Sequence, residues 1–170
     1  RADALIIKAL AWRDLGRIAD AEDCLRAAEA ETPPEDVARR ADVVATRMQL
    51  RYQAGEWAEA LPLAERAGAL YAEAGLAQLS AKMLGRVGVA LLMLGRAEEA
   101  ERQLLVARER SRAVADIESQ RAALLNLVKL TTDRGDVETA LEYLHEGRAL
   151  STEFESPVAF GVELGNIHFG

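Results

Sequence analysis

The sequence predicts an all-α fold built from repeated helix pairs. Apolar residues make up 50% of the 170 residues, and Val and Ile are scattered instead of alternating with polar residues as they do in a half-buried β-strand. Aromatic residues, which favour strands, are only 5% of the chain, whereas Ala and Leu, which favour helices, are abundant. The third observation is a short glycine-centred pattern that recurs at a nearly constant interval.

In this pattern a glycine stands between two runs of residues that favour helices. It reads RDLGRIADAEDCL, YQAGEWAEALPLA, LMLGRAEEAERQL and TDRGDVETALEYL around Gly16, Gly55, Gly95 and Gly135, which lie 39, 40 and 40 residues apart. Glycine inside a helix costs about 1 kcal/mol relative to alanine, whereas just beyond a helix it adopts the left-handed conformation freely. Each glycine therefore predicts a tight turn between two helices, and the fixed interval predicts a stack of such pairs.

Apolar residues on both sides of each turn recur at three- and four-residue steps, as one face of a helix requires. Around Gly95 these residues are Leu84, Val87, Leu91 and Leu94 before the turn, and Ala97, Ala100, Leu104 and Ala107 after it. We expect helices over residues 2–14, 18–31, 35–53, 56–73, 77–94, 97–113, 117–133 and 136–151, with a ninth starting near residue 157.

Small and large apolar residues also recur at fixed distances from each glycine. The set comprises Trp12, Gly16, Ile18, Ala21, Leu25, Ala28 and Pro33, then Gly55, Trp57, Ala60 and Ala67, then Leu84, Val87, Gly88, Leu91, Gly95, Ala97, Ala100, Leu104 and Ala107, then Leu124, Leu127, Gly135, Val137, Ala140 and Leu144. This spacing resembles the tetratricopeptide repeat (TPR). The usual TPR period is 34 residues, so a period of about 40 is similar to the long-repeat branch found in kinesin light chains, polarity adaptors and the sensor arms of bacterial ATPase regulators.

The resemblance implies a right-handed α-α superhelix in which small residues such as Gly88 and Ala100 let paired backbones approach closely. We expect one solenoid domain over residues 1–170. Its repeats would cover about 1–33, 34–75, 76–115 and 116–155, followed by a partial repeat or capping helix at 156–170. The chain starts with Arg1 and stops at Gly170 in what reads as a new helix, so we expect it to be a fragment of a longer protein.

Composition argues against several classes of protein. The 28 acidic residues outnumber the 21 Lys and Arg residues, and the net charge of −7 disfavours a protein that coats nucleic-acid phosphates. Charged residues or glycine interrupt every apolar stretch well before the roughly 18 residues of a membrane span, and no signal peptide opens the chain. Cys24 is the single cysteine, so no intramolecular disulfide can form and a cytoplasmic location is expected.

The sequence carries no recognisable catalytic or cofactor-binding motif. It lacks a phosphate-binding GxxxxGK[ST] loop, an HExxH zinc motif, a GxSxG nucleophile elbow and paired cysteines. His145 and His168 fall on different predicted helices without an evident carboxylate or thiol partner set. We therefore expect no enzymatic activity, no metal site and no cofactor.

A partner would bind on the concave wall, which in the family is built mainly from the first helix of each pair. Counting from each glycine, the residues facing this wall are Ile6, Leu10, Arg13, Asp42, Gln49, Tyr52, Gln53, Lys82, Arg86, Val89, Met93, Asn126, Lys129 and Asp133. The peptide-binding candidates among them are Arg13, Gln49, Tyr52, Lys82, Arg86, Asn126 and Lys129. Solvation of the inner wall is the simpler role for any one of these side chains.

These residues favour a non-catalytic scaffold that binds a protein or peptide segment, with some acidic residues, inside a bacterial regulatory or signalling protein. Lys82 and Arg86 match one part of the carboxylate clamp of TPR cochaperones, but Ile6, Leu10 and Thr46 stand where that clamp needs Lys and Asn. Recognition of chaperone tails is therefore disfavoured. The alternative is a homodimerisation module, because an unfinished last repeat would leave Val162, Ile167 and Phe169 in need of cover.

Overall fold

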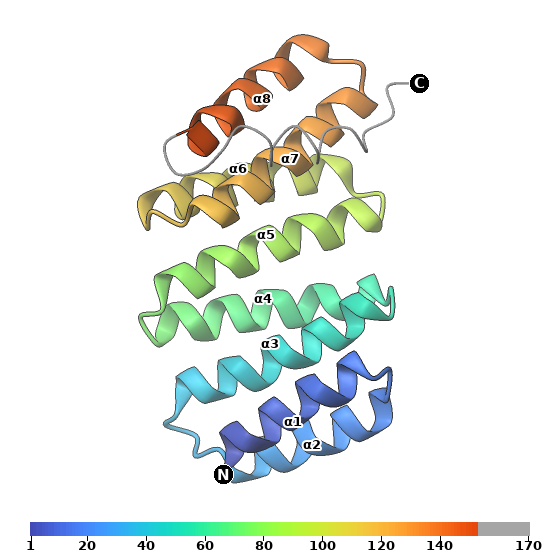
Figure 1. Ribbon diagram of the computed structural model, residues 1–170, viewed down its shortest axis with the longest axis vertical. Helices are drawn as coiled ribbons and strands as arrows, with labels where there is room; N and C mark the ends of the chain where they lie inside the picture. The colour runs from blue at the N-terminus through green and yellow to red at the C-terminus, as the bar shows by residue number, and fades with distance from the viewer. Residues whose placement is uncertain (153–170) are drawn as a thin grey trace.

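A computed structural model, which describes residues 1–152, shows four helix pairs stacked in chain order along the long axis of the molecule (Figure 1). The helices are α1 (Ala2–Asp14), α2 (Ile18–Glu31), α3 (Val37–Gln53), α4 (Trp57–Glu73), α5 (Ala77–Met93), α6 (Ala97–Ala113), α7 (Ile117–Asp133) and α8 (Val137–Thr152). The described residues contain no strand, so the predicted all-α fold is confirmed. The ninth helix and the partial fifth repeat fall outside the described residues.

Each predicted helix starts and ends within two residues of its predicted limits. The largest shift is at α3, which begins at Val37 instead of residue 35. Asp36 precedes this helix, and its carboxylate accepts the backbone N–H of Arg39 at 3.1 Å, which caps the first turn. The capping side chain of Asp36 therefore sets the start of α3 at Val37.

Glycine makes the turn inside each helix pair, as predicted. Gly16, Gly55, Gly95 and Gly135 all have φ between 71° and 78°, in the left-handed region where a side chain is disfavoured. The turn from α4 to α5 uses Gly75 in the same way, whereas the equivalent turn from α6 to α7 uses Ala115, with φ 55°.

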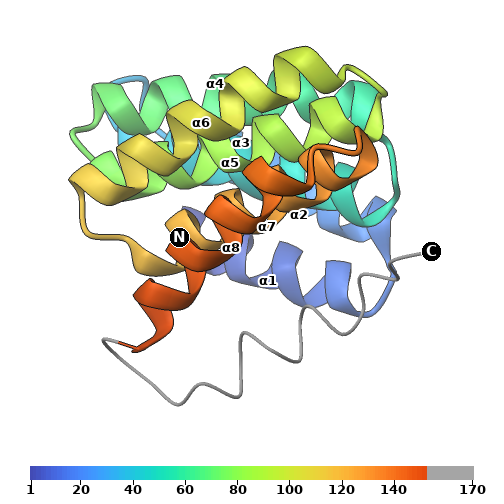
Figure 2. The same cartoon turned by 90° about the horizontal axis from the view of Figure 1, so that it is seen from above.

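The helices form two layers, and neighbouring helices within a layer contact each other in some places and not in others. Seen from above, α4 and α6 lie on one side of the stack, and α1 and α7 lie on the other (Figure 2). Consecutive helices pack along the whole stack, and α1 also contacts α3 as α5 contacts α7. The backbones of α4 and α6 do not contact each other, and each packs against α5 between them.

Two clusters of buried apolar side chains hold the stack together. One joins α1 and α2 to α3 through Val43 and Leu50. The larger one runs from α3 to α6 and reaches Leu130 of α7. Val87, Leu91 and Leu104 are buried as their spacing predicts, but Leu94 is 37% exposed because it follows the last residue of α5.

The helices of the third pair approach each other closely at Gly88. A Cβ atom placed on Gly88 would lie 2.6 Å from Cδ2 and 2.7 Å from Cγ of Leu104, which is fully buried. Gly85, three residues earlier on the same helix, has no atom within 4 Å of the same position. The predicted close approach at Gly88 and Ala100 is therefore confirmed, since Ala100 is also fully buried.

Gly88→Ala should lower the free energy of unfolding by about 1 to 3 kcal/mol, because the added methyl group would overlap the fully buried side chain of Leu104. Gly85→Ala is the matched control on the same helix. It should leave stability unchanged or raise it by up to about 1 kcal/mol, since alanine favours helices over glycine. Urea unfolding followed by circular dichroism measures both, and equal effects of the two substitutions would contradict the close approach.

Candidate functional site

The first helices of the four pairs share one wall, and three adjoining hollows indent it. Their volumes are about 310 Å³ between α1 and α3, about 430 Å³ across α1, α3 and α5, and about 320 Å³ between α5 and α7. We call them the first, central and third hollows, and together the groove. Gln49 lines the first and central hollows, and Lys82 and Arg86 line the central and third, so the three are continuous.

The first hollow is mixed in character, with apolar side chains on α1 beside polar ones that include Asp3 and Asp42. Ile6 and Leu10 of α1 line it together with Asp42 of α3 and Tyr71 of α4. The hydroxyl of Tyr71 donates to Oδ1 of Asp42 at 2.8 Å, so this carboxylate already has a partner. Burial, followed by the hydrogen bond to Asp42, raises the pKa of Tyr71, which keeps the phenol protonated as the donor.

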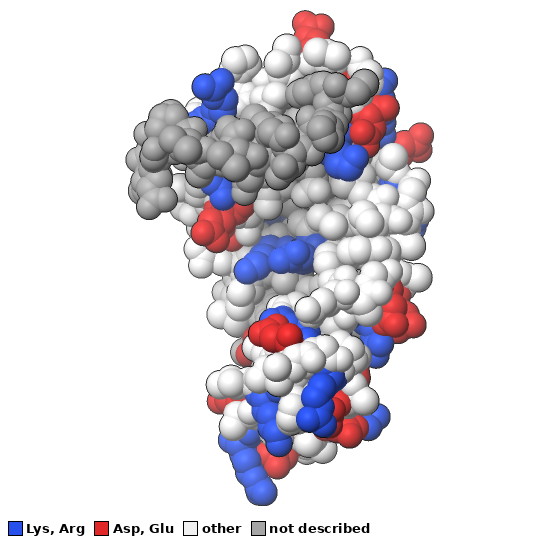
Figure 3. Space-filling model, turned by 45° about the vertical axis from the view of Figure 1, so that its right-hand side comes forward, with Lys and Arg blue, Asp and Glu red and all other residues white. Residues whose placement is uncertain are grey.

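The central hollow brings together five of the seven predicted binding residues. Arg13, Gln49, Tyr52, Lys82 and Arg86 reach it from three different helices. Figure 3 shows a basic patch near the middle of the face in view, with uncharged surface to its right and acidic side chains to its upper left and below it. The register counted from the turn glycines therefore places side chains that are far apart in the chain around one depression.

Arg13 and Gln49 connect α1 to α3 at the edge of the central hollow. The Arg13 guanidinium donates to Oε1 of Gln49 and, at 2.8 Å, to Oδ1 of Asp14. Its charge is thus partly neutralised by its neighbour in the chain. Gln49 keeps its amide NH₂ group, a donor that a bound carboxylate or carbonyl can accept from.

Tyr52 connects α3 to α5 in the floor of the same hollow. Its hydroxyl donates to the backbone carbonyl of Arg86, and the Arg86 guanidinium lies 5.6 Å from the centre of the Tyr52 ring. The Trp57 ring meets Tyr52 edge-on at 4.9 Å. Burial raises the pKa of Tyr52 to about 12, so this side chain is a neutral donor at any physiological pH.

Lys82 and Arg86 differ from most cations of the chain because they have no carboxylate partner among residues 1–152. They lie one turn apart on α5 and both are exposed. Arginines on neighbouring helices do form ion pairs, such as Arg39 with Asp3 and Arg51 with Glu22, both at 2.7 Å. Two unpaired cations one turn apart give the groove a local positive charge that an anionic group can neutralise.

The third hollow continues the groove onto α7. Asn126 lines it beside Lys82 and Arg86, and the Asn126 amide donates to the backbone carbonyl of Ala122 at 2.8 Å, which leaves its oxygen as an acceptor. Asp116 lies at the same hollow, but its carboxylate caps α7 by accepting the N–H of Ser119 at 3.1 Å. This end of the groove is therefore mixed in charge.

Lys129, the seventh predicted residue, does not join the others. Its Nζ lies 2.9 Å from Oδ2 of Asp133, one turn later on α7, and both side chains are more than 60% exposed. Lys129, Asp133 and Met93 line none of the three hollows. A local ion pair on an exposed helix accounts for Lys129 without any partner.

Sequence reasoning missed two contributors to the groove. Tyr71 belongs to the second helix of its pair, so counting along the first helices could not reveal it. Gly85 lines the third hollow, where the absence of a side chain leaves the space open. A signal for Gly85 was present, because a glycine in mid-helix weakens the helix and nothing in the core requires it there.

Solved structures identify this arrangement of helices, although no family model and no curated protein matches the sequence. Aspartyl phosphate phosphatase F from Bacillus subtilis is similar over 96% of this chain, with a TM-score of 0.86 and 16% sequence identity. A Podosopora anserina putative kinesin light chain with nearly identical TPR-like repeats is similar over 91%, with a TM-score of 0.66 and 18% identity. The chain has a TPR-like repeat fold. It spans 43% of the Bacillus protein and 76% of the kinesin light chain structure.

Two further findings concern the described part of this TPR-like stack. No group of three or more His, Cys, Asp or Glu residues within it is arranged to hold a metal ion. None of its helices combines the length and the apolar character that crossing a membrane requires. Cys24 is a buried free thiol in the first core cluster.

The three tyrosines of the chain should ionise late in the folded state, because burial raises the pKa of Tyr52, Tyr71 and Tyr143. A raised folded-state pKa means that the folded protein holds the phenol protons more tightly than the unfolded chain. Stability is therefore full below pH 10 and falls as the pH rises from about 10 through 12. Ultraviolet titration of tyrosinate should show Tyr52 and Tyr71 ionising above pH 10 in the folded protein and near pH 10 once urea is added. Ionisation of all three tyrosines near pH 10 without urea would contradict the buried positions of Tyr52 and Tyr71.

Proposed function

We propose that the chain is a non-catalytic interaction scaffold whose groove binds a segment of another protein that carries acidic residues. The observation that carries the proposal is the exposed pair Lys82 and Arg86, which lies in the central hollow without a carboxylate partner among the described residues. The chain as a whole is acidic, with a net charge of −7, so a positive site on it attracts an anionic segment by local contact rather than by overall charge.

The groove also sets the form of the bound segment. Its first hollow offers apolar surface from Ile6 and Leu10, and its central hollow offers cations and the Gln49 amide. A ligand that spans both would place an apolar side chain against α1 and a carboxylate against α5. Extended binding surfaces of this kind are the usual means by which solenoid proteins recognise partners. The proposal leaves out Lys129, because it is paired with Asp133.

We assign this scaffold to a regulatory or signalling protein of the bacterial cytoplasm, of which the chain would be one solenoid domain. The similarity to a Bacillus protein supports a bacterial setting. That protein is called a phosphatase, so the absence of catalysis needs its own test. Incubating the isolated chain with an aspartyl-phosphate protein should release no more phosphate than the buffer control does.

Charge reversal at Arg86 tests the proposal. The probes are fluorescent twelve-residue peptides with Asp or Glu alternating with Leu, each matched by a peptide with Asn or Gln in place of the acids. Anisotropy should show tighter binding of the acidic peptides, and Arg86→Glu should weaken it about five- to tenfold, because an attractive contact becomes a repulsive one. Added salt should weaken binding to the wild type more than binding to the variant.

Lys129→Glu is the matched control, since it makes the same charge change on an exposed cation outside the three hollows. It should change the affinity by less than about twofold. Equal affinity of the wild type and Arg86→Glu for the acidic peptides would overturn the proposal, as would equal binding of the acidic and amide peptides.

Homodimerisation is the second candidate function, and one observation favours it. The large apolar side chains that are most exposed lie on the first and last described helices, with Ile7 67% and Leu15 70% exposed at α1, and Val137 61% exposed at α8. A second copy that stacks end to end would cover them. Light scattering over a dilution series decides the matter, because a monomer at every concentration removes this candidate.

A further inference from the structure

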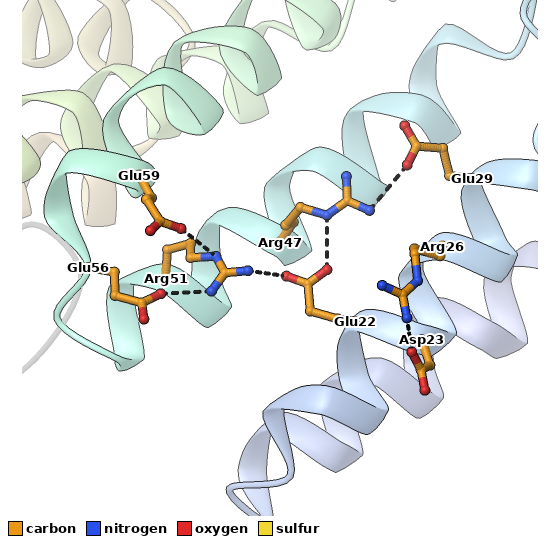
Figure 4. Close-up of polar contacts among 8 residues, drawn as sticks. All are labelled: Glu22, Asp23, Arg26, Glu29, Arg47, Arg51, Glu56 and Glu59. Atoms are coloured by element: carbon orange, nitrogen blue, oxygen red, sulfur yellow. Dashed lines mark hydrogen bonds and ion pairs between the residues drawn. The ribbon is translucent and has the colours of Figure 1, made fainter.

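Side chains from α3 close the space between the first pair of outer helices, α2 and α4. Arg47 lies 3.2 Å from Glu22 and 3.1 Å from Glu29 of α2, as Figure 4 shows. Arg51 lies 2.7 Å from Glu22 and, on the other side, 2.8 Å from Glu56 at the start of α4. This ion-pair network spans the space between α2 and α4 and leaves a hollow of only about 240 Å³ at one end.

Polar contacts also close the space between the last outer helices, α6 and α8. Arg108 of α6 lies 3.2 Å from Glu146 of α8, and Gln120 of α7 donates to the same carboxylate at 3.3 Å. Arg134, just after α7, pairs with Glu101 of α6. Two of the three spaces between neighbouring outer helices are thus bridged by charged side chains.

The middle space, between α4 and α6, lacks the charged side chains that bridge the other two spaces. With the repeat shift of 39 or 40 residues, Gly68 stands where the neighbouring repeats have Glu29 and Arg108. Val106 stands at the position of Glu146, and Val87 at that of Arg47. A hollow of about 570 Å³ lies here, larger than the three hollows of the groove and the one between α2 and α4. We call it the α4–α6 furrow, lined by Gly68, Ala69, Ala72, Ser80, Leu84 and Val106.

Apolar surface remains accessible in this furrow. Val106 is 45% exposed although it lines the furrow, and Ala69 and Ala72 are exposed as well. The hydroxyl of Ser80 donates to the carbonyl of Gly68 at 3.0 Å, so it is already satisfied within the protein. The floor and walls therefore offer few hydrogen-bonding groups to a ligand.

This lack of polar groups decides the conformation of the occupant. An extended peptide would bury backbone N–H and C=O groups against an apolar lining with few partners for them, whereas a helix satisfies these groups internally. The small side chains of Ala69 and Ala72 leave room for a helix backbone to approach. Each wall is a 17-residue helix, or roughly 25 Å at 1.5 Å per residue, which matches an occupant of about three to four turns.

The two walls carry opposite charges. The hydrogen bond to Glu99 and, through space, the charge of Glu65 raise the pKa of Arg96, but Glu65 forms no ion pair with that side chain. Glu65 lines the furrow from α4, and Arg110 lines it from α6. Neither side chain forms an ion pair or a side-chain hydrogen bond with any residue of the described range 1–152. We propose that the α4–α6 furrow is a second binding surface for an amphipathic helix of another protein, with apolar residues facing the furrow, a cation beside Glu65 and a carboxylate beside Arg110.

The furrow is lined by α4, α5 and α6 and opens on the other side of α5 from the groove. Of its lining residues, Met83 also lines the central hollow, whereas Lys82 and Arg86 line the groove and not the furrow.

The test uses the whole chain and three helix-stabilised peptides of 14 residues. All three have the same apolar face of Leu and Ala. The mixed peptide carries Lys on one flank of this face and Glu on the other, the second peptide carries Lys on both flanks, and the third carries Glu on both flanks. Anisotropy should show saturable binding, tightest for the peptide with mixed flanks by about three- to tenfold. Glu65→Lys makes both walls basic and should shift the preference to the peptide with Glu on both flanks.

Val106→Glu introduces the residue of the sister repeat and should weaken binding of the mixed peptide at least about tenfold, since it places a charge in the apolar lining and can pair with Arg110, one turn later on α6, in place of the peptide carboxylate. Ala72→Arg is a second blocking variant in case Val106→Glu lowers stability. The matched control is Val137→Glu, the same change at an exposed valine of α8, and it should leave the affinity unchanged. Circular dichroism checks that each variant is folded.

Three results would overturn this inference. One is the absence of saturable binding by any of the peptides. Another is equal binding by the wild type and both blocking variants. The third is a dimer of the chain that Val106→Glu dissociates and Val137→Glu does not, because the furrow would then hold a second copy instead of a partner helix. Arg86→Glu should not affect these peptides, so failure here is distinguishable from failure at the groove.

Discussion

The close approach of paired helices at small residues is the constraint on which the rest of the structure depends. Gly88 allows Leu104 to pack where a Cβ atom would lie only 2.6 Å away, and Ala60, Ala100 and Ala140 are buried at equivalent positions of their repeats. Helices held this closely have little freedom to rotate about their axes. Their remaining faces are therefore fixed toward two opposite surfaces, the groove on the first helices and the spaces between the outer helices.

On this constant backbone, the surface side chains differ from repeat to repeat, and the proposed binding surfaces lie in those differences. The groove combines apolar and acidic side chains beside α1, is basic at Lys82 and Arg86, and is mixed in charge at α7. Between the outer helices, charged bridges at both ends of the stack give way to small and apolar residues in the middle. A repeat that conserves its packing residues can change its outward residues at little cost to stability, and so acquire different ligands.

The helices and the groove register could be predicted because both depend on local spacing. The turn glycines and the three- and four-residue steps of apolar residues give all eight described helices to within two residues. The same register places Arg13, Gln49, Tyr52, Lys82 and Arg86 around one hollow. Their contacts could not be predicted, since they depend on how far side chains reach between helices, as with Tyr52 and Arg86.

The ion pair of Lys129 and the α4–α6 furrow could not be predicted from the sequence either. Spacing assigns Lys129 to the wall but does not reveal that Asp133 already neutralises it. The repeat spacing does not single out Ala69 and Ala72, which are exposed because the backbones of α4 and α6 lie too far apart to contact each other. The central claim is that the first helices of the pairs form the wall that recognises an acidic segment. Mapping NMR chemical shifts during titration with an acidic peptide tests this claim most directly. The account predicts shifts concentrated in α3 and α5 around the central hollow, and shifts confined to α4 and α6 would contradict it.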